Sequence, residues 1–249
     1  MDLYLAKQVF TCIDNTTLNA TDTAASVEAF CRHTKELGVE NVHVAAVCVY
    51  PRFVGVAKHE LEGSGIGVAS VAGAFPHGQL PTELKVEEVK YAVAQGADEV
   101  DVVINRGAIL SGDYDAACAE IKAMKQACMG RTLKVILETG ELPSPTIIAK
   151  ATEVAIDGGA DFVKTSTGKI GTGATIEAAE VMLNVVKNIV KFNKKTIGFK
   201  AAGGIRKPEE AVEYAQLAKK IMGDEYVKNQ TFRIGASSLT DSLRSILTF

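Results

Sequence analysis

Short apolar runs typical of buried β-strands recur along the whole chain. Three share one pattern, in which a glycine and a short polar turn precede the apolar run: LGVENVHVAAV from Leu37, QGADEVDVVIN from Gln95 and GGADFVKTSTG from Gly158. The glycine is typical of a helix end, and the run that follows is typical of a strand. Other apolar runs begin at Thr11, Val68, Leu133, Thr196 and Phe232. The sequence therefore predicts eight strands.

Amphipathic helices are predicted between these runs. The stretches after Thr23 and Thr175 each carry apolar side chains on one face of a helical period. Pro208, followed by two glutamates, is typical of a helix start, because proline fits the first turn and acids favour its positive end. No linker interrupts the alternation, so we expect residues 1–249 to form one catalytic domain. Eight strand–helix repeats of this total length favour an α/β fold, the closed (β/α)8 TIM barrel, over an open sheet.

Charged or polar side chains interrupt the three related runs at equivalent places. Asp101, Lys164 and His43 each lie five positions after the glycine of their repeat. Equal spacing predicts that the three side chains point to the same side of the sheet, near the C-terminal ends of the strands. TIM barrels carry their active sites at that end.

Two lysines in apolar strands suggest amine chemistry. A buried lysine loses hydration of its charged form, so its pKa falls and Lys164 is expected to be a neutral nucleophile. Lys200, in GFKAAGG, would bring a second ammonium group to the same barrel mouth and favour neutrality of one of the two. Either lysine could instead extend to solvent. Asp101 fits both an ion pair with a lysine and proton transfer, and Asp14 fits either a polar network or a helix cap.

Glycines and serines after the last two predicted strands suggest a phosphate site. In phosphate-binding barrels these two loops and a helix N-terminus surround the phosphate, and glycine lets backbone N–H groups approach it. A further charge would come from the loop after the sixth strand. The serines would also serve as helix caps without any phosphate. The candidate phosphate ligands are Gly168, Lys169, Gly203, Gly204, Gly235, Ser237 and Ser238.

Composition argues against several other classes of protein. The net charge is −3, and the longest basic runs are pairs such as Lys194-Lys195, so no basic stripe for nucleic acid is expected. The five cysteines and four histidines lack metal-ligand spacing, which argues against a bound metal and a disulfide framework. We expect no membrane span and no signal peptide, and therefore a cytoplasmic protein.

Four ordered motifs, ADEVDVVIN, ADFVKTSTG, GFKAAGG and GASS, resemble the 2-deoxyribose-5-phosphate aldolases, and DNTTLN, CVYPRF, FPHG and LETGEL extend the resemblance over nearly the whole chain. It implies reversible cleavage of 2-deoxy-D-ribose 5-phosphate to acetaldehyde and D-glyceraldehyde 3-phosphate, without metal or organic cofactor, in a homodimer. Lys164 would form the Schiff base, Lys200 would lower its pKa, and Asp101 would relay protons through water. The phosphate would bind the glycines and serines named above, with Thr165, Cys48 and Asp14 as further candidate substrate contacts.

Two departures from this family's pattern are visible. Ala201 replaces a proline found in many members, which we expect to alter loop stiffness more than chemistry. The chain stops at Phe249, without the tyrosine-ending tail thought to help proton transfer in longer members. Three alternatives stay open: another Schiff-base aldolase or transaldolase, a phosphosugar isomerase or synthase using carboxylates, and a non-catalytic binding protein.

Overall fold

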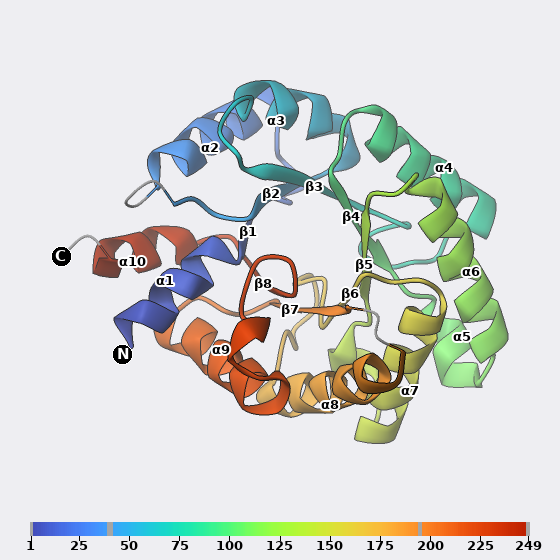
Figure 1. Cartoon of the computed structure of the whole chain (residues 1–249). Coiled ribbons are helices and arrows are strands. Elements are labelled where there is room, and N and C mark those ends of the chain that lie inside the picture. Colours follow the sequence, from blue (N-terminus) through green and yellow to red (C-terminus); the bar gives the residue numbers. More distant parts are fainter. Residues whose placement is uncertain (1, 39–41, 194–195, 248–249) are drawn as a thin grey trace.

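The computed structural model describes residues 2–38, 42–193 and 196–247. Its strands are all parallel and form a closed barrel in the order β1 to β8, each strand pairing with the next along the chain and β8 pairing with β1 (Figure 1). This arrangement confirms the predicted (β/α)8 TIM barrel. The strands are β1 Ile13–Thr16, β2 Ala46–Val49, β3 Gly67–Ala72, β4 Glu99–Val103, β5 Thr132–Ile136, β6 Phe162–Lys164, β7 Gly198–Ala202 and β8 Phe232–Ala236.

Helices form a ring outside the strands, and the first and last of them, α1 and α10, pack against each other (Figure 1). Short 3-10 helices span Pro51–Phe53, Thr139–Glu141 and Asp224–Tyr226. The α-helices are α1 Leu3–Thr11, α2 Ala24–Glu36, α3 Val54–Glu60, α4 Thr82–Ala94, α5 Arg106–Ser111, α6 Tyr114–Ala127, α7 Pro145–Asp157, α8 Ile176–Asn193, α9 Pro208–Met222 and α10 Leu239–Leu247.

Local signals in the sequence set several of these boundaries. Thr23 caps α2, the Thr175 hydroxyl accepts a hydrogen bond from the Ala178 N–H at the start of α8, and Pro208 opens α9. Gly96 and Gly159 follow α4 and α7 with φ near +100°, a conformation that glycine adopts without strain. The predicted helix ends before the repeated strands are therefore confirmed at these two places.

The second strand begins later than its repeat predicts. β2 starts at Ala46, which pairs with Asp14 of β1 on one side and with Gly67 of β3 on the other. His43 consequently precedes the strand. Its ring is hydrogen-bonded to the Val44 carbonyl and packs against Gly65, which precedes β3. The predicted alignment of His43 with Asp101 and Lys164 is wrong.

Two other expectations also change. Residue 11, where the first strand was expected to begin, is the last residue of α1, so β1 starts two residues later, at Ile13. Ala201 is a buried residue of β7, paired with Ile234, so the missing proline affects a strand and not a loop. Phe249 and the basic pair Lys194-Lys195 lie outside the described residues.

The barrel interior is divided between apolar and charged side chains. Its apolar side is a small cluster separate from the main core between strands and helices, formed by Leu18, Ala46, Cys48, Ala69 and Val71. The charged side chains come from strands on the opposite part of the ring and from β1, as described below. Reactive groups and an apolar wall are thereby placed around one space.

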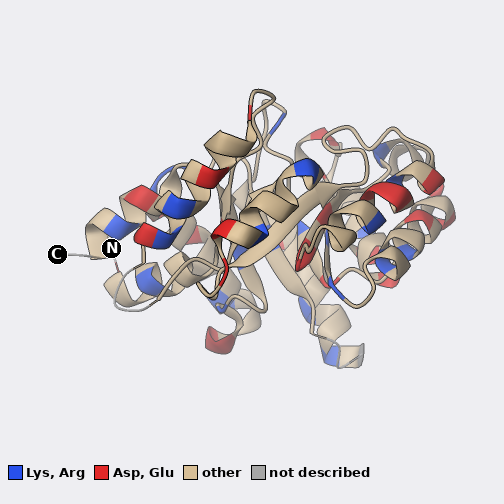
Figure 2. Ribbon diagram, turned by 90° about the horizontal axis from the view of Figure 1, so that it is seen from above, with Lys and Arg blue, Asp and Glu red and all other residues tan. Residues whose placement is uncertain are grey.

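The outer surface carries charges of both signs. Lys and Arg are interspersed with Asp and Glu over the outer helices, without a continuous basic stripe in this view (Figure 2). Among the described residues, no helix combines the length and the apolar character that crossing a membrane requires.

Candidate active site

Strands β1 and β4 to β8 direct charged side chains into the barrel. Alternate residues of a barrel strand face inward, so Glu99 and Asp101 of β4 point the same way. Lys164 of β6 and Lys200 of β7 are register partners in adjacent strands. The interior charge cluster, as we call this set, consists of Asp14, Glu99, Asp101, Lys134, Lys164, Lys200 and Arg233.

Asp101 stands at the centre of the interior charge cluster. Its Oδ2 accepts hydrogen bonds from Lys164 Nζ at 2.9 Å and from Lys200 Nζ at 2.8 Å, and its Oδ1 accepts one from Lys134 Nζ at 2.9 Å. Burial by itself would raise the pKa of Asp101, but the three lysines outweigh it and hold the pKa well below its usual range. Asp101 is therefore ionised at neutral pH.

Lys200 is held by two carboxylates. It forms ion pairs with Asp14 and Asp101, which confirms the predicted Asp101–Lys200 salt bridge. Burial would lower the pKa of Lys200, but the two carboxylates reverse the effect and raise it. Lys200 is fully buried and is not among the residues that line the cavity described below. Asp14 is a member of the polar network, through its ion pairs with Lys134, Lys200 and Arg233.

Lys164 differs from the other cations of the cluster. Among the described residues it forms an ion pair with Asp101 alone, and 4% of its side chain is exposed. Burial lowers its pKa, and Lys200 adds to this effect while Asp101 opposes it. Lys164 is therefore the amine of the cluster that loses its proton most readily, which is the property a nucleophile requires.

Three members of the interior charge cluster, Glu99, Lys134 and Arg233, were not singled out from the sequence. Lys134 forms ion pairs with Asp14, Glu99 and Asp101. Burial would lower the pKa of Lys134, but the three carboxylates outweigh this effect and raise it. Arg233 donates to both oxygens of Glu99 at 2.6 and 3.1 Å and to Asp14 Oδ1 at 2.5 Å. All three interrupt apolar strands as Lys164 does, so the same signal would have found them.

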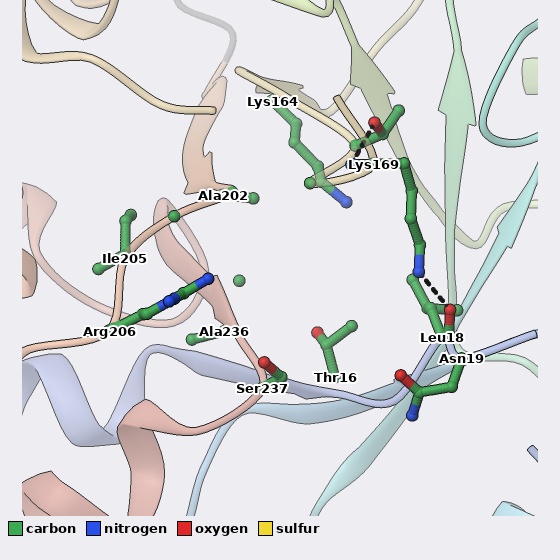
Figure 3. A pocket seen from close by; sticks show the side chains of 15 residues that line it. Thr16, Leu18, Asn19, Lys164, Lys169, Ala202, Ile205, Arg206, Ala236 and Ser237 are labelled. Atoms are coloured by element: carbon green, nitrogen blue, oxygen red, sulfur yellow. Dashed lines mark hydrogen bonds between the residues drawn. The ribbon is translucent and has the colours of Figure 1, made fainter. Parts of the chain in front are cut away.

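A cavity of about 210 Å³ opens at the C-terminal end of the barrel, next to Lys164. Lys164 and Arg206 point into it from different sides, and Lys169 spans one edge and donates to the Leu18 carbonyl (Figure 3). Six predicted phosphate ligands line the cavity: Gly168, Lys169, Gly203, Gly204, Gly235 and Ser237. The other lining residues are Thr16, Leu18, Asn19, Lys164, Thr167, Ala202, Ile205, Arg206 and Ala236.

Glycine at the cavity rim permits two loops to approach closely. Gly203 has φ of +88°, and a side chain there would meet the Cα atoms of Gly173 and Gly168 at 3.1 and 3.2 Å. The loop after β6 and the loop after β7 therefore pack backbone to backbone. Backbone this close to a cavity edge suits recognition of an anion by peptide N–H groups.

Four of the predicted substrate-binding residues do not line the cavity. Asp14 is buried in the cluster because cations surround it, and Thr165 exchanges hydrogen bonds with the Ala202 backbone, joining β6 to β7. Cys48 belongs to the apolar wall, and burial raises the pKa of its thiol to about 11. Ser238 is exposed and directly precedes α10.

A second polar network supports the loop after β6. Glu138, fully buried, accepts hydrogen bonds from the Thr167 hydroxyl at 2.5 Å and the Thr167 N–H at 3.2 Å. Arg106 lies 3.5 Å from the same carboxylate and donates to the His77 carbonyl at 2.7 Å. The network joins loops that follow four different strands, a grouping with no local sequence signal.

The cavity thus places an amine with a lowered pKa beside a glycine-lined, cationic rim. No three His, Cys, Asp or Glu side chains within the described part of the chain are arranged to hold a metal ion. The arrangement is suited to imine formation with a carbonyl compound that also carries an anionic group.

Comparison with known proteins shows the family of the chain. Residues 8–244 match the family described as DeoC/LacD family aldolase. A Coccidioides immitis protein described as a deoxyribose-phosphate aldolase is 32% identical, with 95% of this chain and 86% of that chain covered and a TM-score of 0.81. A Toxoplasma gondii protein of the same description is 25% identical, covering 99% and 96%, with a TM-score of 0.87.

A third similar structure is the deoxyribose phosphate aldolase of Aeropyrum pernix, described as tetrameric. It is 27% identical, with 99% of this chain and 98% of that chain covered and a TM-score of 0.73. The family match extends over most of the chain, and the similar structures share its fold. The chain therefore belongs to the DeoC/LacD family of aldolases and is a lyase.

Proposed function

We propose that this enzyme is a class I aldolase that reversibly cleaves 2-deoxy-D-ribose 5-phosphate to acetaldehyde and D-glyceraldehyde 3-phosphate. The proposal is carried by the position of Lys164, whose buried amine has a lowered pKa and lines a cationic, glycine-rich cavity. The names of similar structures support the choice of substrate.

In the proposed reaction, Lys164 Nζ adds to the C1 carbonyl of the open-chain sugar, and loss of water gives a protonated imine. Removal of the C3 hydroxyl proton breaks the C2–C3 bond, whose electron pair passes to the imine nitrogen. Glyceraldehyde 3-phosphate leaves, and an enamine remains on Lys164. Protonation at C2 and hydrolysis release acetaldehyde and restore the free amine.

Asp101 and Lys200 have different roles in this scheme. Asp101 lies 2.9 Å from Lys164 Nζ and offsets the positive charge of the protonated imine. Its lowered pKa makes it a weak base, so we propose that it orients a water molecule that carries the proton. Lys200 stays charged and helps to keep Lys164 neutral before the substrate binds.

The phosphate group is proposed to bind at the cavity rim. Lys169 and Arg206 supply positive charge, and the peptide groups around Gly204 and Ser237 supply N–H donors. These contacts are remote from C1, C2 and C3, so their binding energy serves to hold the sugar in position during bond cleavage.

Trapping with borohydride tests the proposal. Acetaldehyde and borohydride added together should attach an ethyl group to Lys164, which peptide mapping by mass spectrometry identifies. Lys200 and Lys134 serve as internal controls, because both are expected to stay charged. Lys164→Arg should abolish labelling, since a guanidinium remains protonated at neutral pH. A label on Lys200, or no label, would exclude the assigned imine.

The substrate is tested by product analysis. Release of acetaldehyde from 2-deoxyribose 5-phosphate should far exceed release from other pentose phosphates, and a different preferred substrate would indicate another Schiff-base aldolase. We further propose that residues 1–249 form one catalytic domain of a cytoplasmic homodimer. Light scattering of the purified protein tests the dimer against the tetramer described for the Aeropyrum pernix aldolase.

A further inference from the structure

The end of the interior charge cluster away from the cavity is closed by a bidentate pair between Glu99 and Arg233. Glu99 is the first residue of β4, and Arg233 is the second residue of β8. Arg233 Nη2 donates to Glu99 Oε1 at 2.6 Å, and Arg233 Nη1 donates to Asp14 Oδ1 at 2.5 Å. The side chains are 13% and 7% exposed, and neither residue lines the cavity.

Charges in the interior charge cluster do not balance when every group is ionised. The carboxylates of Asp14, Glu99 and Asp101 are fewer by one than the cationic groups of Lys134, Lys164, Lys200 and Arg233. Burying an uncompensated charge is costly, so the cluster favours the loss of one proton.

The pattern of ion pairs determines which cation gives up its proton. Lys200 pairs with Asp14 and Asp101, and Lys134 pairs with both of these and with Glu99. Arg233 does not deprotonate in proteins. Lys164 pairs with Asp101 alone among the described residues and points into the cavity (Figure 3), so it loses its proton more readily than the other cations of the cluster.

We infer that Glu99 and Arg233 are positioning residues that set the protonation state of Lys164 through the charge balance of the cluster, without touching substrate. Arg233 is linked to Lys164 through Asp14, Lys200 and Asp101 in turn. Buried charges about 10 Å apart still interact by roughly three times the thermal energy at an effective dielectric constant near 20. The inference rests on the proposed function only in the use made of the neutral amine.

Other charged or titratable groups also face Lys164. They are Asp101 from β4, Lys134 from β5, Lys200 from β7 and the Cys48 thiol from β2, with Lys169 and Arg206 across the cavity. The variants below leave all of these groups in place. A change in Lys164 titration therefore reports on the altered pair.

Opposite effects are expected from the two halves of one ion pair. Glu99→Gln removes a negative charge, enlarges the cationic surplus and should lower the titration midpoint of Lys164 by about one pH unit. Arg233→Gln removes a positive charge, abolishes the surplus and should raise the midpoint by about the same amount. The double variant restores the original difference and should return the midpoint close to that of the unaltered enzyme.

Competitive acetylation measures the midpoint without any need for imine formation. The full-length enzyme is treated with trace acetic anhydride across pH, and the rate at Lys164 is compared with that at exposed Lys90 by mass spectrometry. In each modification the neutral amine attacks the anhydride, an amide forms and acetate leaves. Arg233→Lys keeps the charge, so its midpoint should stay near that of the unaltered enzyme even if stability falls.

Midpoints that move in the same direction in both single variants, or that do not move, would overturn the inference, because a structural defect gives no opposite signs. If the Arg233 variants do not fold, Glu99→Gln alone decides, since its midpoint must fall. Failure of the proposed function is seen separately, as absence of borohydride trapping in the unaltered enzyme. A shifted midpoint without trapping would leave the charge-balance inference standing.

Discussion

The interior charge cluster and the cavity rim hold ions by different means. In the cluster, side chains from barrel strands make direct ion pairs in a space that solvent hardly reaches, as between Asp101 and Lys200. At the rim, loops after β6, β7 and β8 present glycine backbone and two cations, Lys169 and Arg206, to an open cavity. The first region fixes protonation states, and the second provides a place for a ligand.

This difference teaches where substitutions should affect chemistry and where they should affect binding. A charge changed in the cluster acts at low effective dielectric, so it should shift the pKa of Lys164 and with it the rate at a given pH. A charge changed at the rim is partly screened by water and should alter affinity for the phosphorylated substrate. Lys164 belongs to both regions, since it is paired in the cluster and lines the cavity.

The largest effect is expected for Lys200→Leu. Without this cation Lys164 loses a neighbouring positive charge and no longer shares Asp101 Oδ2 with Lys200, so the pKa of Lys164 should rise and its neutral fraction at pH 7 should fall. A rise of two units would cost about a hundredfold in rate at neutral pH. Because the neutral amine accumulates as pH passes the raised pKa, activity should recover at alkaline pH. The measurement is kcat/KM across pH for the variant and for the unaltered enzyme.

Lys200→Arg is the matched control for this prediction. It keeps the positive charge, so its pH profile should remain near that of the unaltered enzyme even if geometry lowers the rate. Inactivity of Lys200→Leu at every pH would mean that Lys200 carries a proton directly or serves mainly to hold Asp14 and Asp101 in place.

A smaller loss is expected when a negative charge is added to the rim. Ser237→Asp would oppose the phosphate across the cavity and should raise KM for 2-deoxyribose 5-phosphate about thirtyfold, with little change for unphosphorylated deoxyribose. Ser238→Asp is the matched comparison, because Ser238 directly precedes α10 but does not line the cavity. Equal KM changes for both sugars would indicate a structural effect.

Next in size is the removal of a rim cation. Arg206→Gln should raise KM for the phosphorylated substrate about tenfold, since a charge-assisted hydrogen bond at a partly exposed site contributes little more than that. The pH profile of kcat should not move, because the guanidinium lies outside the interior charge cluster. A shift of that profile would contradict the separation between the two regions.

The sequence predicts the charged residues of the strands better than the binding residues of the loops. Lys164, Lys200 and Asp101 are visible because a charge in an apolar strand requires a partner, and the structure supplies one for each. The same reasoning applies to Lys134, which lies nearer the middle of the barrel than the strand ends where an active site is sought. Burial depth depends on strand register across the ring, and the repeat around His43 misleads on this point.

Loop residues carry weaker signals. Gly203 and Gly204 are recognisable because few other residues fit such loops, but Arg206 is an ordinary surface arginine until the loop places it over the cavity. The pair of Glu138 and Arg106 joins segments that follow different strands. Such a contact arises from barrel closure and has no counterpart in local spacing.

Glu138→Gln is expected to have the smallest effect on catalysis and to show how far the rim depends on buried support. Glu138 has φ of +55° and holds both the hydroxyl and the N–H of Thr167, which lines the cavity. An amide would keep one acceptor but present N–H groups to Arg106, so the free energy of unfolding should fall by about 1–3 kcal/mol. KM for the phosphorylated substrate should rise by a few-fold, because Thr167 adjoins Gly168 and Lys169. Urea unfolding and steady-state kinetics measure the two effects, and Thr167→Val, which removes the hydroxyl from the other side, is the matched control. An unchanged pH profile in both variants would keep this network apart from the interior charge cluster, whereas a shift in the titration of Lys164 would show that the two regions are electrostatically coupled.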